Sequence, residues 1–416
     1  MKRFLLRTLL ALSGLVVALL IAEIALRIIG YSAPYLYMTD QERGIALRPN
    51  VEGWYRREGK QYVRINSDGL RDREHSKEKP ANRLRIAVIG DSYAEALQVP
   101  VESAFWAVME RRLQECQALG GREVEVINFG VSGYGTAQEL ITLRRHVWDY
   151  KPDIVVLAVT TNNDITDNSR ALKKSDIPYF VYGDGGLTLD DSFQNSRTFR
   201  LRNSAFDRAL NWIRNRSRVI QAVVEAARAI RIHMTRETAQ SSPPVPGQAQ
   251  TEGTPERPSN RRDPPLEEPG IDNLIYREPH DAVWEDAWRV TEGLIKLMRD
   301  EVRAGGAKFL VVTLSNGIQV YPNRAARQDF LRRVGASDLF YPDLRLKDFC
   351  EREGIPVLTL APRLQAYADQ NNDFLHGFDE SIGNGHWNPL GHRVAGEMIA
   401  QKLCEGITNQ ELDEIK

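Results

Sequence analysis

The stretch that decides the fold runs from residue 85 to residue 93 and reads Arg-Ile-Ala-Val-Ile-Gly-Asp-Ser-Tyr. Its apolar part is short, continuous and rich in β-branched residues, which is typical of a strand buried on both faces of a sheet. Similar runs recur with helical patterns between them, at residues 124–128, 154–159, 308–314 and 355–360. This alternation predicts a three-layer α/β/α domain built on a five-stranded parallel sheet.

The residues that leave these strands form a chemically distinctive set. In open parallel sheets, ligands bind at the carboxyl ends of the strands, so these residues meet at one edge. A serine, a glycine-rich turn, an asparagine and a histidine are the parts that acyl transfer needs: a nucleophile, two kinds of oxyanion donor and a general base. The stretches are Gly-Asp-Ser-Tyr (90–93), Asn-Phe-Gly-Val-Ser-Gly-Tyr-Gly (128–135), Thr-Asn-Asn-Asp (161–164) and Asn-Gly-His-Trp-Asn-Pro-Leu-Gly-His (384–392).

These four motifs, in this order, resemble the SGNH (GDSL-like) hydrolase superfamily, in particular its membrane-anchored bacterial-type members. The similarity covers roughly residues 84–164 and 307–400 and implies a flavodoxin-like sheet and a serine esterase activity. It assigns Ser92 as the nucleophile and His386 as the general base. It also implies an oxyanion hole formed by the backbone N–H groups of Ser92 and Gly133 and the side-chain amide of Asn163.

One departure from the family concerns the residue that orients the histidine. The family usually places an aspartate two or three residues before it, but Gly383 and Asn384 occupy these positions here. An asparagine can hold the ring through a hydrogen bond but brings no charge. Asp379, Glu380 and a backbone carbonyl are the alternatives, and the sequence leaves the choice among them open.

The amino terminus predicts a membrane anchor. Lys2, Arg3 and Arg7 precede an uncharged run at residues 8–22, and mainly apolar residues continue to Ile29. About twenty such residues span the hydrocarbon core as a helix, and basic residues on the amino side orient that end toward the cytoplasm. We therefore expect a signal-anchor helix over residues 1–30, with the body extracytoplasmic, on the periplasmic or cell-surface side. A cleaved signal peptide is the alternative.

Composition divides the rest of the chain. Residues 31–80 are irregular and polar, which predicts a stalk that becomes a cover segment, and anchored members of the family tend to carry such a segment around Asn66–Asp72. Residues 81–416 form the predicted hydrolase-like domain, and an insertion at residues 170–305 interrupts it. Within the insertion, apolar spacing predicts one helix from residue 204 to residue 236. Eight of the chain's twenty prolines fall in the segment 241–270, which predicts a disordered loop.

Charge excludes one class of protein and singles out one segment. The chain of 416 residues has 55 basic and 56 acidic residues, and this balance argues against a nucleic-acid binder. Between Arg197 and Arg236, however, there are ten arginines and two acids. Such a run forms a solvated helix face, contacts anionic lipid headgroups or steers an acidic polysaccharide, and the sequence does not decide among these roles.

Cysteine and histidine spacing gives no sign of a metal or a cofactor. Cys116, Cys350 and Cys404 are an odd number of residues without a C-x-x-C spacing, which argues against a disulfide framework and against a thiolate zinc site. No pair of histidines has metal-ligand spacing together with a carboxylate in a helical frame. We therefore expect neither a metal nor a cofactor.

Together, these features predict a membrane-anchored extracytoplasmic serine esterase that acts on O-acyl groups, foremost O-acetyl groups, of a carbohydrate or glycan. An O-acyltransferase that passes the acyl group to a polysaccharide hydroxyl is a second hypothesis, because water and a sugar accept an acyl group from the same intermediate. A third hypothesis is a catalytically weak glycan-binding module that kept the fold without the orienting aspartate.

Overall fold

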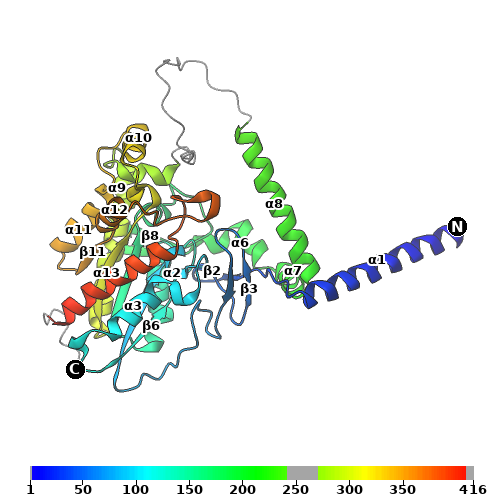
Figure 1. The fold of residues 1–416 in the computed structure, drawn as a ribbon, viewed down its shortest axis with the longest axis horizontal. Helices are drawn as coiled ribbons and strands as arrows, with labels where there is room; N and C mark the ends of the chain where they lie inside the picture. Colours follow the sequence, from blue (N-terminus) through cyan, green and yellow to red (C-terminus); the bar gives the residue numbers. More distant parts are fainter. Residues whose placement is uncertain (1, 241–269, 409–416) are drawn as a thin grey trace, which may run out of the picture. The chain divides into compact units, whose positions relative to one another are not determined.

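The computed structural model describes residues 2–240 and 270–408, and these residues fall into two compact units (Figure 1). One unit contains the chain up to Tyr35 together with the helices from Ala205 to Gln240. The other contains the remaining described residues, including the central sheet. The predicted disordered segment 241–270 lies outside the described residues, except for Gly270.

The central sheet has five parallel strands in the order β11-β10-β7-β5-β6. Their bounds are β5 (Arg83–Gly90), β6 (Glu123–Asn128), β7 (Ile154–Thr160), β10 (Lys308–Leu314) and β11 (Val357–Thr359). Strand β5 pairs with β6 on one side and with β7 on the other, so the chain changes its direction across the sheet at β5. Ligands bind at such a switch point, outside the carboxyl ends of the strands. The predicted five-stranded α/β/α fold is confirmed.

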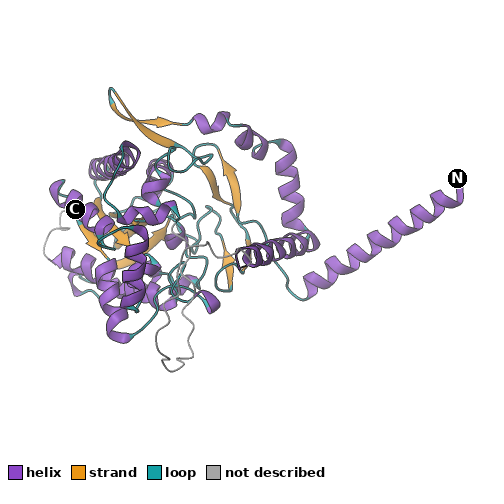
Figure 2. Cartoon of the chain, turned by 90° about the horizontal axis from the view of Figure 1, so that it is seen from above, coloured by secondary structure: helices purple, strands orange, loops and turns teal. Residues whose placement is uncertain are grey.

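Helices cover both faces of this sheet (Figure 2). The side chains of a strand alternate between its faces, and β5 shows this alternation in its packing. Leu84, Ile86 and Val88 pack in one apolar cluster with α3, α12 and α13, whereas Ala87 and Ile89 pack in another with α4, α9 and α11. The helices of this unit are α2 (Ser92–Glu95), α3 (Phe105–Gln114), α4 (Thr136–Arg145), α5 (Asp164–Asp167), α6 (Arg197–Arg202), α9 (Ala282–Ala304), α10 (Arg324–Val334), α11 (Tyr341–Arg352), α12 (Ala361–Asn371) and α13 (Pro389–Thr408).

The segment before the sheet folds into two hairpins, which lie within residues 31–80, the predicted stalk and cover segment. Their strands are β1 (Tyr37–Asp40), β2 (Gly44–Leu47), β3 (Glu52–Tyr55) and β4 (Gln61–Arg64). After the second hairpin, the Asp72 carboxylate accepts the backbone N–H of Asn128 at 2.9 Å, and the Asn128 amide donates to the Arg71 carbonyl at 3.2 Å. The cover segment is therefore hydrogen-bonded to the end of β6.

The insertion contains a third hairpin that the sequence analysis did not predict. Its strands are β8 (Tyr179–Gly183) and β9 (Gly186–Asp190), and they pair in an antiparallel manner. Short 3-10 helices complete the unit: η1 (Val101–Ser103), η2 (Gln117–Leu119), η3 (Val147–Tyr150), η4 (Ser192–Asn195), η5 (Ile271–Tyr276), η6 (Gly317–Val320) and η7 (Asp379–Ser381).

The smaller unit is helical. Helix α1 (Lys2–Ile28) is, among the described residues, the one helix long and apolar enough to cross a membrane. The prediction of a single helix over residues 204–236 is wrong, because the chain forms α7 (Ala205–Arg216) and α8 (Arg218–Gln240) with a break at Ser217. The Ser217 hydroxyl donates a hydrogen bond to Glu23 of α1, a contact that the local sequence does not reveal.

A disulfide joins Cys116 to Cys404, with the Cα atoms 5.9 Å apart. It connects the end of α3 to α13, two helices on the same face of the sheet. The sequence argument against a disulfide framework missed this pair, because a separation of 288 residues leaves no local spacing to recognise. Cys350 is buried and unpaired.

Candidate active site

Ser92 is the first residue of α2, directly after β5. The Asp91 carboxylate caps this short helix by accepting the backbone N–H of Tyr93 at 2.9 Å. The turn after β6 packs closely against α2, because a Cβ atom at Gly130 would lie only 2.6 Å from the Glu95 nitrogen. A glycine is therefore required where the second motif meets the first.

His386 lies in the loop between η7 and α13, and its ring meets the Ser92 side chain. The distance from His386 Nε2 to Ser92 Oγ is 2.8 Å, which is hydrogen-bond distance. The sequence-predicted serine and histidine, 294 residues apart, are thus in contact. A nucleophile and its base need this arrangement.

Glu58 is the residue that orients the histidine, and the sequence analysis missed it. One carboxylate oxygen lies 2.5 Å from His386 Nδ1, and the other accepts the backbone N–H of His386 at 2.7 Å. For the group that orients His386, the sequence left open Asp379, Glu380, Asn384 and a backbone carbonyl. In the structure, a carboxylate 328 residues upstream makes this contact instead.

Two glycines allow this contact. Glu58 lies in the turn between β3 and β4, and the next residue, Gly59, has φ +66° and packs so closely that a Cβ atom would lie 2.6 Å from the Gln98 carbonyl oxygen. On the other side, Gly385 has φ +83°, and a Cβ atom there would collide with the Glu58 carboxylate. Both turns depend on glycine for conformation and for space. No local pattern marks Glu58 itself, whereas the Glu-Gly pair in a hairpin turn is visible in the sequence.

The electrostatics of the pair suit a general base. Burial alone would lower the pKa of His386, but the hydrogen bond and the negative charge of Glu58 outweigh burial and raise it. For Glu58, burial would raise the pKa, yet the hydrogen bonds and charge of His386 lower it. The carboxylate therefore stays ionised and favours a protonated imidazole, which is the form that arises when the serine loses its proton.

Two of the three predicted oxyanion donors, Asn163 and Gly133, differ in where they lie. The Asn163 side chain is at the cavity that holds Ser92, and its amide lies 3.2 Å from the Asp91 carboxylate. Gly133 is not among the residues that line this cavity, and it has φ +80° in the loop after β6. Its neighbour Ser132 donates its backbone N–H to Glu95 of α2 at 2.6 Å, so this loop is attached to the helix that carries the serine.

The cavity at Ser92 has a volume of about 480 Å³ and a mainly polar lining. Amide and carboxylate side chains from several loops line it together with the candidate nucleophile and base. Aromatic and aliphatic side chains contribute a smaller share, from Tyr93, Ile318 and Phe330. The polar group comprises Asn162, Asn163, Asp272, Asn273, Asn316 and Asn384.

Two other histidines near the site are structural. His376 is buried between the Ser315 hydroxyl and the Gly385 carbonyl, and burial lowers its pKa to about 4. His392 accepts the backbone N–H of Phe105 at 3.2 Å, and burial lowers its pKa to about 3. Both rings are neutral near pH 7. His376 contacts the loop that carries Gly385, and His392 contacts the start of α3.

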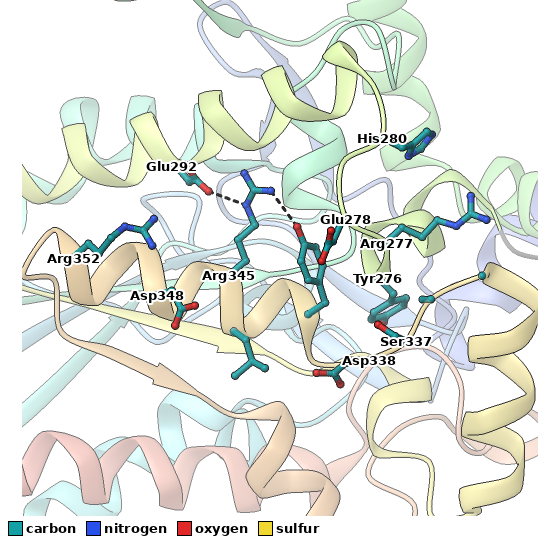
Figure 3. A pocket seen from close by; sticks show the side chains of 14 residues that line it. Tyr276, Arg277, Glu278, His280, Glu292, Ser337, Asp338, Arg345, Asp348 and Arg352 are labelled. Atoms are coloured by element: carbon teal, nitrogen blue, oxygen red, sulfur yellow. Dashed lines mark hydrogen bonds and ion pairs between the residues drawn. The ribbon is translucent and has the colours of Figure 1, made fainter.

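A larger cavity of about 1090 Å³ lies elsewhere in the same unit and shares no lining residue with the cavity at Ser92. Its charged side chains are partly paired with one another (Figure 3). Arg345 donates to Glu292 at 3.0 Å and to the Tyr341 hydroxyl at 3.1 Å, and its guanidinium lies 4.4 Å from the centre of the Trp288 ring. These contacts indicate a structural role for Arg345.

The solved structures that resemble this chain are ester hydrolases. They include an acetyl xylan esterase, AlAXEase (12% identity, 78% of this chain and 99% of that chain covered, TM-score 0.35). A lipolytic protein of the G-D-S-L family from Desulfitobacterium hafniense has 11% identity, 76% and 98% coverage and a TM-score of 0.33. A two-domain esterase (CEX) active on acetylated mannans has 11% identity, 78% and 50% coverage and a TM-score of 0.35.

No family model and no curated protein matches this sequence. Of the three structures named above, the protein from Desulfitobacterium hafniense is the one whose name gives the G-D-S-L family, which the sequence motifs resemble. Because the identities and TM-scores are low, the functional argument rests on the geometry of this chain.

Proposed function

We propose that this chain is a serine esterase of the SGNH (GDSL-like) type. It hydrolyses O-acyl esters, foremost O-acetyl esters, of a carbohydrate or glycan. The observation that carries the proposal is the continuous hydrogen-bonded chain from the Glu58 carboxylate through the His386 ring to the Ser92 hydroxyl. A serine hydroxyl is a weak nucleophile until a base accepts its proton, and an imidazole held by a carboxylate is such a base.

The reaction proceeds in two halves. Ser92 Oγ attacks the ester carbonyl while its proton moves to His386 Nε2, and the carbonyl oxygen becomes an oxyanion. The Asn163 amide and the Ser92 N–H donate to this oxyanion, whereas Gly133, which the resemblance also assigns to the oxyanion hole, does not line the cavity. His386 then gives its proton to the departing alcohol, which leaves an acyl-serine. In the second half, His386 removes a proton from water, the resulting hydroxide attacks the acyl-serine, and the carboxylic acid and free Ser92 are released.

The lining of the cavity supports a carbohydrate rather than a lipid as the group that carries the ester. Six amide or carboxylate side chains line the cavity, and they suit the many hydroxyl groups of a sugar. A long acyl chain would instead need an extended apolar channel, and the apolar lining consists of Tyr93, Ile318 and Phe330. A short acyl group such as acetyl fits this balance.

The third hypothesis, a catalytically weak binding module, rested on the missing aspartate. Glu58 provides a carboxylate in that role, so this ground no longer applies. The transferase hypothesis shares every step up to the acyl-serine with the esterase. The two differ only in which hydroxyl accepts the acyl group, so the choice of acceptor is left to experiment.

We infer further that α1 is a retained anchor and that the body is extracytoplasmic. Three basic residues stand at the start of α1, which favours that orientation. The far end of α1 is part of the folded unit, since Glu23 accepts hydrogen bonds from Ser217 and from the backbone of Val219. Cleavage after α1 would leave these donors without their acceptor. The Cys116–Cys404 disulfide also fits an oxidising compartment.

The test uses the full chain in detergent micelles or lipid nanodiscs, with a chromogenic acetyl ester and an acetylated polysaccharide as substrates. Wild-type protein should release acetate and react with a serine-directed phosphonate, and Ser92→Ala should lose both properties. Ser381→Ala, an exposed serine in η7, is the matched control and should keep both.

If wild-type protein shows neither turnover nor labelling that depends on Ser92, both enzyme hypotheses fail and the binding module is left. If acetate release is slow and an added oligosaccharide becomes acetylated, the protein is a transferase. Hydrolysis that does not depend on an added acceptor supports the esterase.

A further inference from the structure

Helix α7 in the smaller unit presents apolar side chains to its surroundings. Phe206 is 77% exposed, Leu210 50%, Trp212 55% and Ile213 46%. Residues 206, 210 and 213 fall on one side of the helix because they are three or four positions apart, whereas Trp212 is exposed on a different side. We call Phe206, Leu210 and Ile213 the outward face of α7.

The opposite side of α7 is polar and faces the protein. The Asn215 side chain accepts the backbone N–H of Tyr35 at 2.8 Å, and the Arg214 guanidinium lies 5.1 Å from the centre of the Tyr35 ring. Asn211 donates to Asp207 at 2.7 Å on the same side. A helix on the surface of a water-soluble protein has the reverse arrangement, with its apolar side packed and its polar side exposed. The surroundings of the outward face are therefore not water.

The contacts between the end of α1 and the junction of α7 and α8 bear on what surrounds the outward face. The Glu23 carboxylate accepts hydrogen bonds from the Ser217 hydroxyl at 3.0 Å and from the backbone N–H groups of Arg218 and Val219 at 3.1 and 3.0 Å. The Arg27 guanidinium donates to the carbonyl of Arg216, the last residue of α7, at 2.6 Å. The junction of α7 and α8 is thus fixed to the carboxyl-terminal end of the candidate membrane helix.

The position of Glu23 sets the depth of this junction. The candidate span runs from Arg3 to Ile28, and Glu23 stands five residues before its end. At 1.5 Å per residue, Glu23 lies about 7.5 Å inside that end of the span. Helices that lie in a membrane interface bury their apolar side about 5–10 Å into the boundary between headgroups and acyl chains, which is the same depth.

The charge of the segment fits an anionic lipid surface. Between residues 205 and 231 there are six arginines and two acids. The Arg216 guanidinium lies 4.1 Å from the centre of the Trp212 ring, so a cation and an amphipathic ring stand together near the end of α7. Tryptophan is enriched at membrane interfaces, and basic residues near an anionic leaflet are attracted to it.

We propose that α7 lies in the plane of the bilayer interface. Its outward face contacts the boundary between headgroups and acyl chains, and the arginines of α7 and of the start of α8 contact anionic lipid headgroups. This inference does not depend on the esterase activity, because it rests on α1, α7 and α8 alone. It assigns lipid contact to the part of the arginine-rich segment that follows Ala205.

The test places a nitroxide label at single introduced cysteines, Leu210→Cys on the outward face and Arg208→Cys at an exposed position two residues away, which does not lie on that face. The full chain is reconstituted in phosphatidylcholine vesicles that contain phosphatidylglycerol. Collision rates with oxygen, which concentrates in the bilayer, and with a water-soluble nickel chelate report the surroundings of each label. The unsubstituted chain is the control for labelling, because Cys350 is buried and the other two cysteines are paired.

The label at position 210 should show a severalfold higher ratio of oxygen to nickel collisions than the label at position 208. The ratio at position 210 should fall in vesicles of phosphatidylcholine alone. Equal access of nickel to both labels would place α7 in water and overturn the proposal. Protection of the label at 210 from both reagents would also overturn it, because protein would then cover the outward face. Thermal unfolding midpoints equal to that of the unsubstituted chain establish that both variants are folded.

Discussion

The substitution Glu58→Gln tests the candidate triad most directly, because it keeps the size of the side chain and removes its charge. In the native protein, both carboxylate oxygens accept hydrogen bonds from His386, at 2.5 Å from Nδ1 and 2.7 Å from the backbone nitrogen. Glutamine has one oxygen and one NH₂ group. If its oxygen accepts from Nδ1–H, its NH₂ group faces the backbone N–H. If the glutamine amide is flipped, its NH₂ group donates to His386 Nδ1. Nε2 of the ring then carries the proton and cannot accept one from Ser92.

The expected loss is large. Replacing the acid by its amide in a serine triad lowers kcat about 10⁴-fold through the wrong tautomer. Here the side chains of His386 and Glu58 remain 26% and 19% exposed, so water partly replaces the lost acceptor. We therefore expect kcat to fall about 10³-fold, which corresponds to about 4 kcal/mol at 1.36 kcal/mol per factor of ten.

The pH profile should change in a defined direction. The general base must be neutral, so activity is lost as the pH falls through the pKa of His386. Glu58 raises this pKa above its usual value near 6.5, so the acidic limb of kcat/KM in the native protein should have its midpoint above that value. Glu58→Gln removes the raising effect and leaves burial, which lowers the pKa. The residual activity should therefore have an acidic limb shifted to lower pH.

The assay is hydrolysis of a chromogenic acetyl ester across the pH range. Glu52→Gln is the matched control, because Glu52 lies on the same hairpin and makes an exposed ion pair with Arg64 at 3.0 Å. Such a pair contributes little, and the activity should stay within about twofold of the native value. A Glu58→Gln protein that folds, keeps its native kcat and keeps its native acidic limb would refute the role of Glu58.

Two further predictions concern the oxyanion hole and the disulfide. Asn163→Ala should lower kcat about 10²–10³-fold with little change in KM, because an oxyanion donor acts in the transition state. Asn162 lines the same cavity, and Asn162→Ala, the control, should lower kcat far less. A larger effect on KM than on kcat would instead indicate a role in substrate binding. The double substitution Cys116→Ser and Cys404→Ser should lower the free energy of unfolding in urea by about 2–5 kcal/mol and leave kcat unchanged, since the bond closes a long loop and neither cysteine lines the cavity at Ser92. An unchanged urea midpoint would contradict this.

The central sheet could be predicted from sequence because its strands are continuous apolar runs. The predicted run 308–314 has the same bounds as β10, which pairs with a neighbour on each side. The predicted run 355–360 is longer than β11, which extends from Val357 to Thr359 and pairs with β10 alone. An edge strand extends only as far as it pairs with its one neighbour, here residues 311–313 of β10, and the apolar pattern of the strand itself does not contain that information.

The contact between Ser92 and His386 could also be anticipated, because both follow strands whose carboxyl ends meet at one edge. Glu58 could not be anticipated in this way. It stands in a turn of the cover segment, 328 residues from the histidine, and its environment Arg-Arg-Glu-Gly-Lys is that of an exposed hairpin tip. The break at Ser217 has a local part, since the Ser217 hydroxyl accepts the backbone N–H of Ile220 at the start of α8. The same hydroxyl donates to Glu23 of α1, a distant partner that the local sequence does not reveal.

The position of Glu58 makes the cover segment part of the candidate active site. The compact unit that holds the sheet begins at Leu36, so the hairpins and the sheet belong together. Asp72 attaches the cover to the backbone of Asn128 in the second motif, and Glu58 attaches it to His386 in the fourth. The missing aspartate before the histidine is therefore consistent with an active triad, because the turn between β3 and β4 provides the carboxylate from the other end of the chain. The orientation of the base then depends on how the segment that follows α1 folds against the sheet.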